Sequence, residues 1–234
     1  MPADEVSRLL PGAIVAPPVS FGDVLASALG NRPARRITRI AIIDGYFERM
    51  AAVWHKEITF ALERGIEVWG AASMGALRAA ELASCGMKGV GEIHRAFARG
   101  ELVADDEVAV AHLPGEHRYQ AVSDALVNLR DGIARAPMLT DRTRRALVEL
   151  ARARFYRERT WATLLADGRA AGLPRTQLTA LAAWPKPDRK AADARLLLRR
   201  LASTPIRRPA SIRTPRTWAF ERLLEIIASQ APRR

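Results

Sequence analysis

The sequence predicts an α/β fold in which a small, mostly parallel β-sheet with crossover helices is followed by an all-helical C-terminal region. Apolar β-branched runs alternate with helical patterns up to about residue 131, and only helical patterns follow residue 139. Prolines and glycines crowd the first 35 residues. We therefore expect an N-terminal arm (residues 1–36), an α/β core (residues 37–135) and a basic helical region (residues 136–234).

The arm and the first half of the core give the clearest element predictions. In the arm we expect an extended stretch over residues 13–18 and a short helix over residues 23–29. The core then gives a strand at 37–45, a helix at 51–64, a strand at 66–72 and a helix at 74–84. This order favours parallel neighbouring strands, whose carboxyl ends lie at one edge of the sheet. Asp44 and Ser73 should share that edge.

The remaining elements are predicted from shorter patterns. We expect a helix over 91–98, a third strand over 107–113 and a helix over 116–129. An acidic turn, Asp105-Asp106-Glu107, leads into the third strand. The C-terminal helices are predicted at residues 141–156, 158–166, 175–183, 188–201 and 217–228.

Composition excludes several classes of protein. Apolar residues make up 49% of the chain, but no run approaches the roughly 20 residues of a membrane-spanning helix. The N-terminus lacks the pattern of a secretory signal, so we expect a cytoplasmic protein. A single cysteine, Cys85, excludes an intrachain disulfide, a Cys-rich zinc site and a redox pair. His94, His112 and His117 are isolated in the sequence, so we predict no metal and no cofactor.

The net charge of +12 is unevenly distributed along the chain. Residues 41–131 hold 14 acidic and 9 basic residues, whereas residues 132–234 hold 23 basic and 8 acidic ones. The basic part could contact an acidic protein or a nucleic acid, or it could simply present solvated helix faces. A nucleic-acid partner is not expected, because no nucleic-acid motif occurs and aromatic residues make up only 6%.

Lysine is rare among the basic residues. Of 37 basic residues only four are lysines, namely Lys56, Lys88, Lys186 and Lys190. A lysine in such a chain reflects either drift or the need for an amine that can lose its proton, which a guanidinium cannot do.

Ser73 lies between a predicted strand and a predicted helix, in Gly70-Ala-Ala-Ser-Met-Gly75. Small neighbours and a following helix match the layout of a nucleophile elbow, in which backbone N–H groups hold an oxyanion. The spacing differs from the usual elbow, because Ala71 stands two residues before the serine, where glycine is expected. A serine that opens a helix is more often an N-cap, so both interpretations stay open.

A nucleophilic serine needs a base, and Lys56 and His55 are the candidates. Both lie near the start of the helix predicted at 51–64, close to the expected edge of the sheet. Burial near Trp54 would favour a neutral Lys56, although a surface ion pair is the plainer alternative. Asp44 could orient Lys56 or simply end its strand. Arg78 and Glu81 are spaced as a helix-surface pair.

Several longer motifs occur in order along the chain. They are Pro17-Pro-Val-Ser-Phe-Gly-Asp23, Ile42-Ile-Asp-Gly-Tyr-Phe47, Ala52-Val-Trp-His-Lys-Glu-Ile58, Gly70-Ala-Ala-Ser-Met-Gly-Ala-Leu-Arg-Ala-Ala-Glu81, Gly86-Met-Lys-Gly-Val-Gly91, Asp105-Asp-Glu-Val-Ala-Val110 and Ser123-Asp-Ala-Leu-Val-Asn-Leu-Arg130. In these motifs the sequence resembles the TfuA family over about residues 17–130. It departs from that family at Ala72, where many members have a second serine.

The resemblance implies an accessory role in peptide backbone thioamidation. The expected partners are a YcaO-type enzyme, a ThiS-like carrier protein with a thiocarboxylated C-terminus, and a peptide substrate bound together with YcaO. The family's catalytic Ser-Lys pair falls on Ser73 and Lys56, and it would release sulfide by hydrolysing the carrier's thioacid. The amides of Met74 and Gly75 would then hold the oxyanion, and the acidic turn would bind a partner. A non-catalytic scaffold that docks the substrate on YcaO is the alternative.

Overall fold

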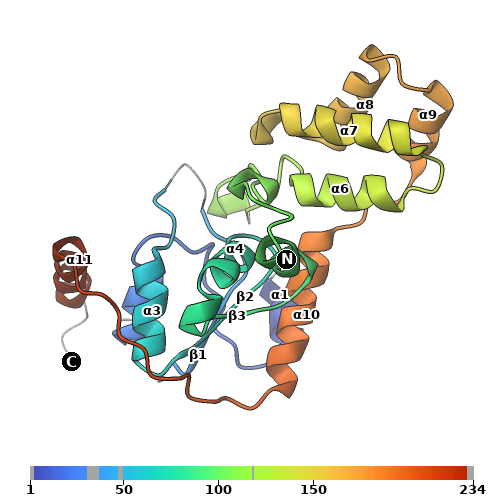
Figure 1. Ribbon diagram of the computed structural model, residues 1–234. Coiled ribbons are helices and arrows are strands. Elements are labelled where there is room, and N and C mark those ends of the chain that lie inside the picture. Colours follow the sequence, from blue (N-terminus) through green and yellow to red (C-terminus); the bar gives the residue numbers. More distant parts are fainter. Residues whose placement is uncertain (1–2, 31–36, 47–49, 118, 231–234) are drawn as a thin grey trace. The chain divides into compact units, whose positions relative to one another are not determined.

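The computed structural model describes residues 3–30, 37–46, 50–117 and 119–230. Parts of the predicted arm, residues 1–2 and 31–36, therefore lie outside the described residues. The chain divides into two compact units, and in the sequence the second interrupts the first (coloured by residue number in Figure 1). Unit 1 consists of Met1–Leu102 and Ala191–Arg234, and unit 2 of Val103–Lys190. The predicted division into three successive domains stays a prediction.

A three-stranded parallel sheet forms the centre of unit 1. Its strands are β1 (Arg39–Ile42), β2 (Glu67–Gly70) and β3 (Lys88–Gly89), in that spatial order. Helix α3 (His55–Glu63) connects β1 to β2, and α4 (Met74–Glu81) is the main element between β2 and β3. The predicted fold class, a small parallel sheet with connecting helices followed by a helical C-terminal region, is confirmed.

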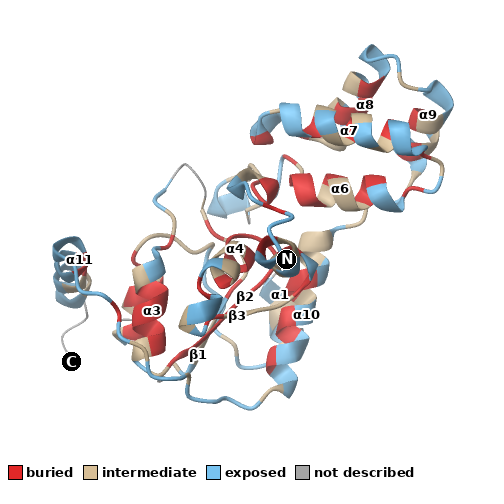
Figure 2. Cartoon of the chain, in the orientation of Figure 1, coloured by how far each residue is buried: buried red, intermediate tan, exposed pale blue. Residues whose placement is uncertain are grey.

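Both faces of the central strand β2 are covered, as its continuous burial requires (Figure 2). Val68 contributes to a core shared with Ile58 and Leu62 of α3. The next residue, Trp69, belongs to a separate cluster with Leu197 and Leu201 of α10 (Arg189–Ser203). Successive side chains of a strand point to opposite faces, so α3 and α10 cover different sides of the sheet.

Except for the helix at the N-terminus, which was not predicted, the other helices follow the sequence predictions closely in most cases. Unit 1 also contains α1 (Ala3–Leu9), α2 (Asp23–Ala28), the 3-10 turn η1 (Ala83–Cys85), α5 (Glu92–Ala98) and α11 (Trp218–Ser229). Unit 2 contains the 3-10 turns η2 (Asp105–Glu107), η3 (Gly115–His117) and η4 (Tyr156–Glu158), with helices α6 (Leu126–Arg135), α7 (Asp141–Ala153), α8 (Trp161–Ala170) and α9 (Arg175–Ala183).

Two element predictions are wrong. The third strand is not at residues 107–113 but at Lys88–Gly89, which pairs in parallel with β2. The helix expected over 116–129 begins only at Leu126. The preceding segment contains a left-handed residue at Tyr119 (φ 55°) and an isolated antiparallel bridge between His112 and Ala121, neither of which an α-helix can accommodate.

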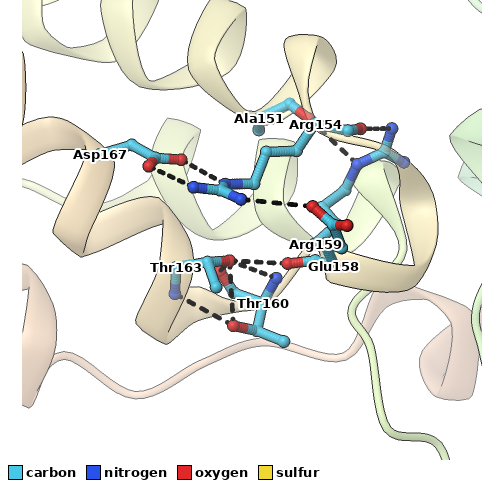
Figure 3. Close-up of polar contacts among 7 residues, drawn as sticks. All are labelled: Ala151, Arg154, Glu158, Arg159, Thr160, Thr163 and Asp167. Atoms are coloured by element: carbon cyan, nitrogen blue, oxygen red, sulfur yellow. Dashed lines mark hydrogen bonds and ion pairs between the residues drawn. The ribbon is translucent and has the colours of Figure 1, made fainter.

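Unit 2 has a core of its own and a buried polar centre. Leu129, Leu147, Leu164 and Leu178, one from each of its four helices, are buried in one apolar cluster. Arg159, just before α8, is only 1% exposed. Figure 3 shows its side chain reaching the carbonyl oxygen of Ala151, near the end of α7.

In the part of the chain that the structure describes, no helix is long and apolar enough to cross a membrane.

Candidate functional site

Ser73 lies in the turn that joins the end of β2 to the start of α4. Its N–H donates to the carbonyl oxygen of Ile43 at 3.2 Å, so Ser73 lies beside the end of β1 and close to Asp44. The side chain of Asp44 accepts a hydrogen bond from the N–H of Gly45 at 3.0 Å. The expected edge shared by Asp44 and Ser73 is therefore present.

The backbone at this turn is strained. Ala72 has a φ of 69°, in the left-handed region, although it carries a β-carbon. Ser73 has φ −129° and ψ −124°, outside the common regions, and is only 6% exposed. Strain of this kind persists where surrounding packing imposes it, and it is typical of functional turns.

Close packing between strand and helix explains the two glycines of the motif. A β-carbon on Gly75 would lie 1.8 Å from the carbonyl oxygen of Ile42, and one on Gly70 would lie 1.9 Å from the carbonyl oxygen of Gly75. Both clashes involve backbone atoms, which cannot move aside as side chains do. The glycines therefore let α4 begin directly against the ends of β1 and β2.

Ser73 is the N-cap residue of α4, but its side chain makes no capping hydrogen bond to the described residues of the helix. The simple N-cap interpretation is thus not supported. The N–H groups of Met74 and Gly75 donate to no acceptor among the described residues. They are two of the unsatisfied donors that begin every helix, and they suit an anionic oxygen.

The amine of Lys56 is hydrogen-bonded to a residue other than Ser73. Its Nζ donates to Oγ1 of Thr217, the N-cap residue of α11, at 2.7 Å and lies 6.0 Å from the ring centroid of Phe220. Trp54, which was expected to surround the amine, packs edge-on against Phe21 with ring centroids 4.6 Å apart.

His55, Arg78 and Glu81 form one polar cluster. His55 Nε2 lies 2.9 Å from Glu81 Oε2, which also pairs with Arg78 Nη1 at 2.6 Å. Arg78 Nε donates to the carbonyl oxygen of Val53 at 3.1 Å and so ties α4 to the start of α3. Glu81 is eight residues beyond Ser73, which is about 12 Å along a helix. The cluster therefore lies too far along α4 for His55 to deprotonate Ser73 in this arrangement.

The acidic turn is largely occupied by intramolecular ion pairs of unit 2. Glu107 is buried and accepts two hydrogen bonds from Arg130, at 2.7 and 3.0 Å. Asp106 pairs with the buried Arg159 at 2.9 Å. Asp105 is the one exposed acid of the turn. Partner binding through this turn stays a prediction.

Two residues near the site escaped the sequence analysis. Glu57 is fully buried and its carboxylate accepts from the N–H groups of Trp54 and Leu25, which fixes the start of α3 against α2. Burial raises the pKa of Glu57, while backbone donors act in the opposite direction. Thr217 contacts Lys56 from 161 positions away. The only sequence signal for Glu57 was its place three residues after Trp54, the N-cap residue of α3.

Among the described residues, no group of three or more His, Cys, Asp or Glu side chains is arranged to hold a metal ion.

The comparison with protein families identifies the chain. The family model described as TfuA-like protein matches residues 44–160, half of the chain. The chain belongs to the TfuA-like family. A search of curated proteins finds no match. The family match includes Asp44, Lys56, Ser73 and the acidic turn, and it supports the accessory role in YcaO-dependent thioamidation that the family implies.

Proposed function

We propose that this TfuA-like protein hydrolyses the thiocarboxylated C-terminus of a ThiS-like carrier and supplies the sulfide to a YcaO-type enzyme. The proposal names Ser73 as the nucleophile and Lys56 as the base. The observation that carries it is the turn at Ser73, where a strained backbone places a serine at the edge of the sheet, beside two helix N–H groups that have no acceptor among the described residues.

The chemistry needs only groups that the chain provides. Neutral Lys56 accepts the proton of Ser73, and the serine oxygen attacks the thioacid carbonyl carbon. The N–H groups of Met74 and Gly75 stabilise the resulting oxyanion. The C–S bond then breaks, and the sulfur leaves as hydrogen sulfide with the proton that Lys56 had accepted. Water attacks the remaining acyl ester, frees the carrier carboxylate and returns a proton to Ser73.

A second candidate, a non-catalytic scaffold that docks the peptide on YcaO, is favoured by one observation. The Lys56 amine is hydrogen-bonded to Thr217 and not to Ser73. A hydrolase with this pair requires the lysine side chain to change its position, whereas a scaffold does not.

The test is sulfide release from a purified thiocarboxylated carrier. We expect Ser73→Ala and Lys56→Arg each to lower the rate by about 100-fold or more, because arginine keeps the charge but does not accept the proton. Ser7→Ala, an exposed serine on α1, is the matched control. Release at the normal rate by Ser73→Ala would exclude the hydrolase.

Free sulfide separates the two candidates further. If hydrolysis is the lost step, YcaO together with the Ser73→Ala variant should thioamidate its peptide once sulfide is added. If the chain acts only as a scaffold, Ser73→Ala should support thioamidation as well as the unsubstituted chain does, with or without added sulfide.

A further inference from the structure

One face of α3 is covered by the chain segment that leads into α11. Lys56, Phe60 and Glu63 are spaced four and three residues apart, so they lie on the same side of the helix. Each of the three contacts residues between Thr214 and Phe220, more than 150 positions further along the chain.

These contacts fix the segment at successive points. Glu63 accepts a hydrogen bond from the N–H of Thr214 at 3.1 Å and pairs with Arg216 at 3.1 Å. Phe220 is fully buried and packs edge-on against Phe60, with ring centroids 5.9 Å apart. The start of α11 is therefore anchored beside α3, and the Thr217 hydroxyl is held where the Lys56 amine can reach it.

The Lys56 side chain is directed towards α11 and not towards α4. His55, one residue earlier, points towards α4, where it contacts Glu81. Successive residues of a helix are rotated by about 100°, so Lys56 faces a different side. Figure 1 shows α11 and α4 on opposite sides of α3. The hydrogen bond to Thr217 thus holds the amine on the side of α3 away from α4, which begins at Ser73.

We propose that Thr217 is a positioning residue that holds the Lys56 amine at α11 and so limits its availability to Ser73. The inference rests on the proposed Ser73–Lys56 hydrolase. The Thr217 hydroxyl and Ser73 compete for one amine. An exposed hydrogen bond of this kind shifts the equilibrium between the two positions of the amine by about two- to fivefold. Binding of the carrier can therefore easily shift the amine back towards Ser73.

The first test measures the lysine amine itself. The full-length chain is treated with a trace of acetic anhydride, and the acetylation rate of each lysine is determined by peptide mass spectrometry. We expect Thr217→Val, which removes the hydroxyl and keeps the shape, to raise the rate at Lys56 about two- to fivefold. Thr217→Ser keeps the hydroxyl and should keep the original rate. Lys88, Lys186 and Lys190 serve as internal controls.

The second test measures sulfide release by the same variants. Thr217→Val should raise the rate about two- to fivefold, while Thr179→Val, at an exposed threonine of α9, should not change it. An unchanged acetylation rate at Lys56 in Thr217→Val, or a lower rate of sulfide release, would overturn the inference. Faster acetylation of Lys56 without sulfide release by any variant would support the contact with Thr217 and refute the hydrolase.

Discussion

The close approach of α4 to β1 depends on a single residue, Gly75. A β-carbon on Gly75 has no room, because the carbonyl oxygen of Ile42 would lie 1.8 Å from it. In a Gly75 variant the backbone of this turn must therefore move, and Ser73 would move with it.

The sequence pattern placed the turn correctly, because a run of small residues between a predicted strand and a predicted helix is typical of a tight turn.

We expect Gly75→Ala to lower the free energy of unfolding by about 3 kcal/mol or more, since the clash is with backbone. Gly100→Ala is the control: a β-carbon there meets nothing within 4 Å, and its positive φ (71°) should cost only about 1 kcal/mol. Urea-induced unfolding measures both. Equal losses in the two variants would contradict the close-packing explanation.

His94 gives a prediction for the dependence of stability on pH. Its imidazole packs against Gly89, and its Nε2 is buried without a hydrogen-bond partner among the described residues. Burial, aided by Arg95 and opposed by Asp193, lowers the pKa of His94 from its ordinary value of 6.5. The unfolded chain therefore binds a proton more readily than the folded chain does.

The stabilisation that a neutral His94 provides is present above pH 6.5 and is lost as the pH falls through the lowered folded-state pKa. The loss is at most about 1.4 kcal/mol per pH unit. When urea unfolding at pH 7.5 and at pH 5.5 is compared, the free energy of unfolding should fall more in the unsubstituted chain than in the His94→Leu variant. Identical losses would show that the packing of His94 is unrelated to its titration.

The sequence predicted Lys56 as a candidate residue but not the position of its side chain. The scarcity of lysine selected the residue, and the helical pattern placed it on α3. Its contact with Thr217 depends on where a distant helix packs, and no local pattern contains that information. The same is true of the burial of Arg159, which no local pattern predicts.

At the scale of elements, Arg159 holds the end of α7. The last carbonyl groups of a helix lack partners within it. Arg159 donates to the carbonyl oxygens of Ala151 and Arg154 at 3.0 Å, and to the carboxylate of Asp106 at 2.9 Å. One buried guanidinium therefore joins α7 to the acidic turn. Beside it, Arg154 pairs with Asp167 of α8 (Figure 3).

We expect Arg159→Lys to lower the free energy of unfolding by about 3 kcal/mol or more, because an ammonium cannot reach these divergent acceptors and leaves some unsatisfied in the interior. Arg142→Lys, on the exposed face of α7, should change it by less than about 0.5 kcal/mol. Guanidinium-induced unfolding distinguishes them. A small effect of Arg159→Lys would mean that water reaches this site.

Short or irregular elements account for the wrong predictions. β3 has two residues, too few for any alternation to be visible. Of the apolar residues that suggested a strand, Val108 is buried while Val110 and Leu113 are only partly so, because the segment is irregular. In contrast, α9 agrees with its predicted bounds, Arg175–Ala183, because Pro174 precedes it and an apolar periodicity defines its length.

At the scale of the molecule, an intact unit is inserted within a discontinuous one. Unit 2 is one continuous segment, Val103–Lys190, with a separate apolar core. The Arg159 network lies wholly inside it. An insertion is not visible in the sequence, because α10 and α11 look like a continuation of the preceding helices, while their apolar faces belong to unit 1.

We expect the isolated fragment Val103–Lys190 to fold by itself. Far-ultraviolet circular dichroism should show a helical spectrum and one cooperative thermal transition. The fragment with Arg159→Ala should lose that transition or show it at a markedly lower temperature. A gradual, non-cooperative change in the unsubstituted fragment would show that the core of unit 2 is insufficient.

The chain order of unit 1 has a consequence for synthesis on the ribosome. Leu197 of α10, which packs on the sheet, and Phe220 of α11, which packs on α3, are both fully buried in unit 1, although the sheet and α3 are translated more than 100 residues earlier. Domains usually fold as they emerge, from the N-terminus onward. Here the nascent sheet emerges with α3 on one side but with the side that α10 covers still open, and the face of α3 that contacts Phe220 is open as well, while the inserted helices are made. The earliest part of this protein to be translated is thus among the last to be completed, and that interval is when it most needs a chaperone.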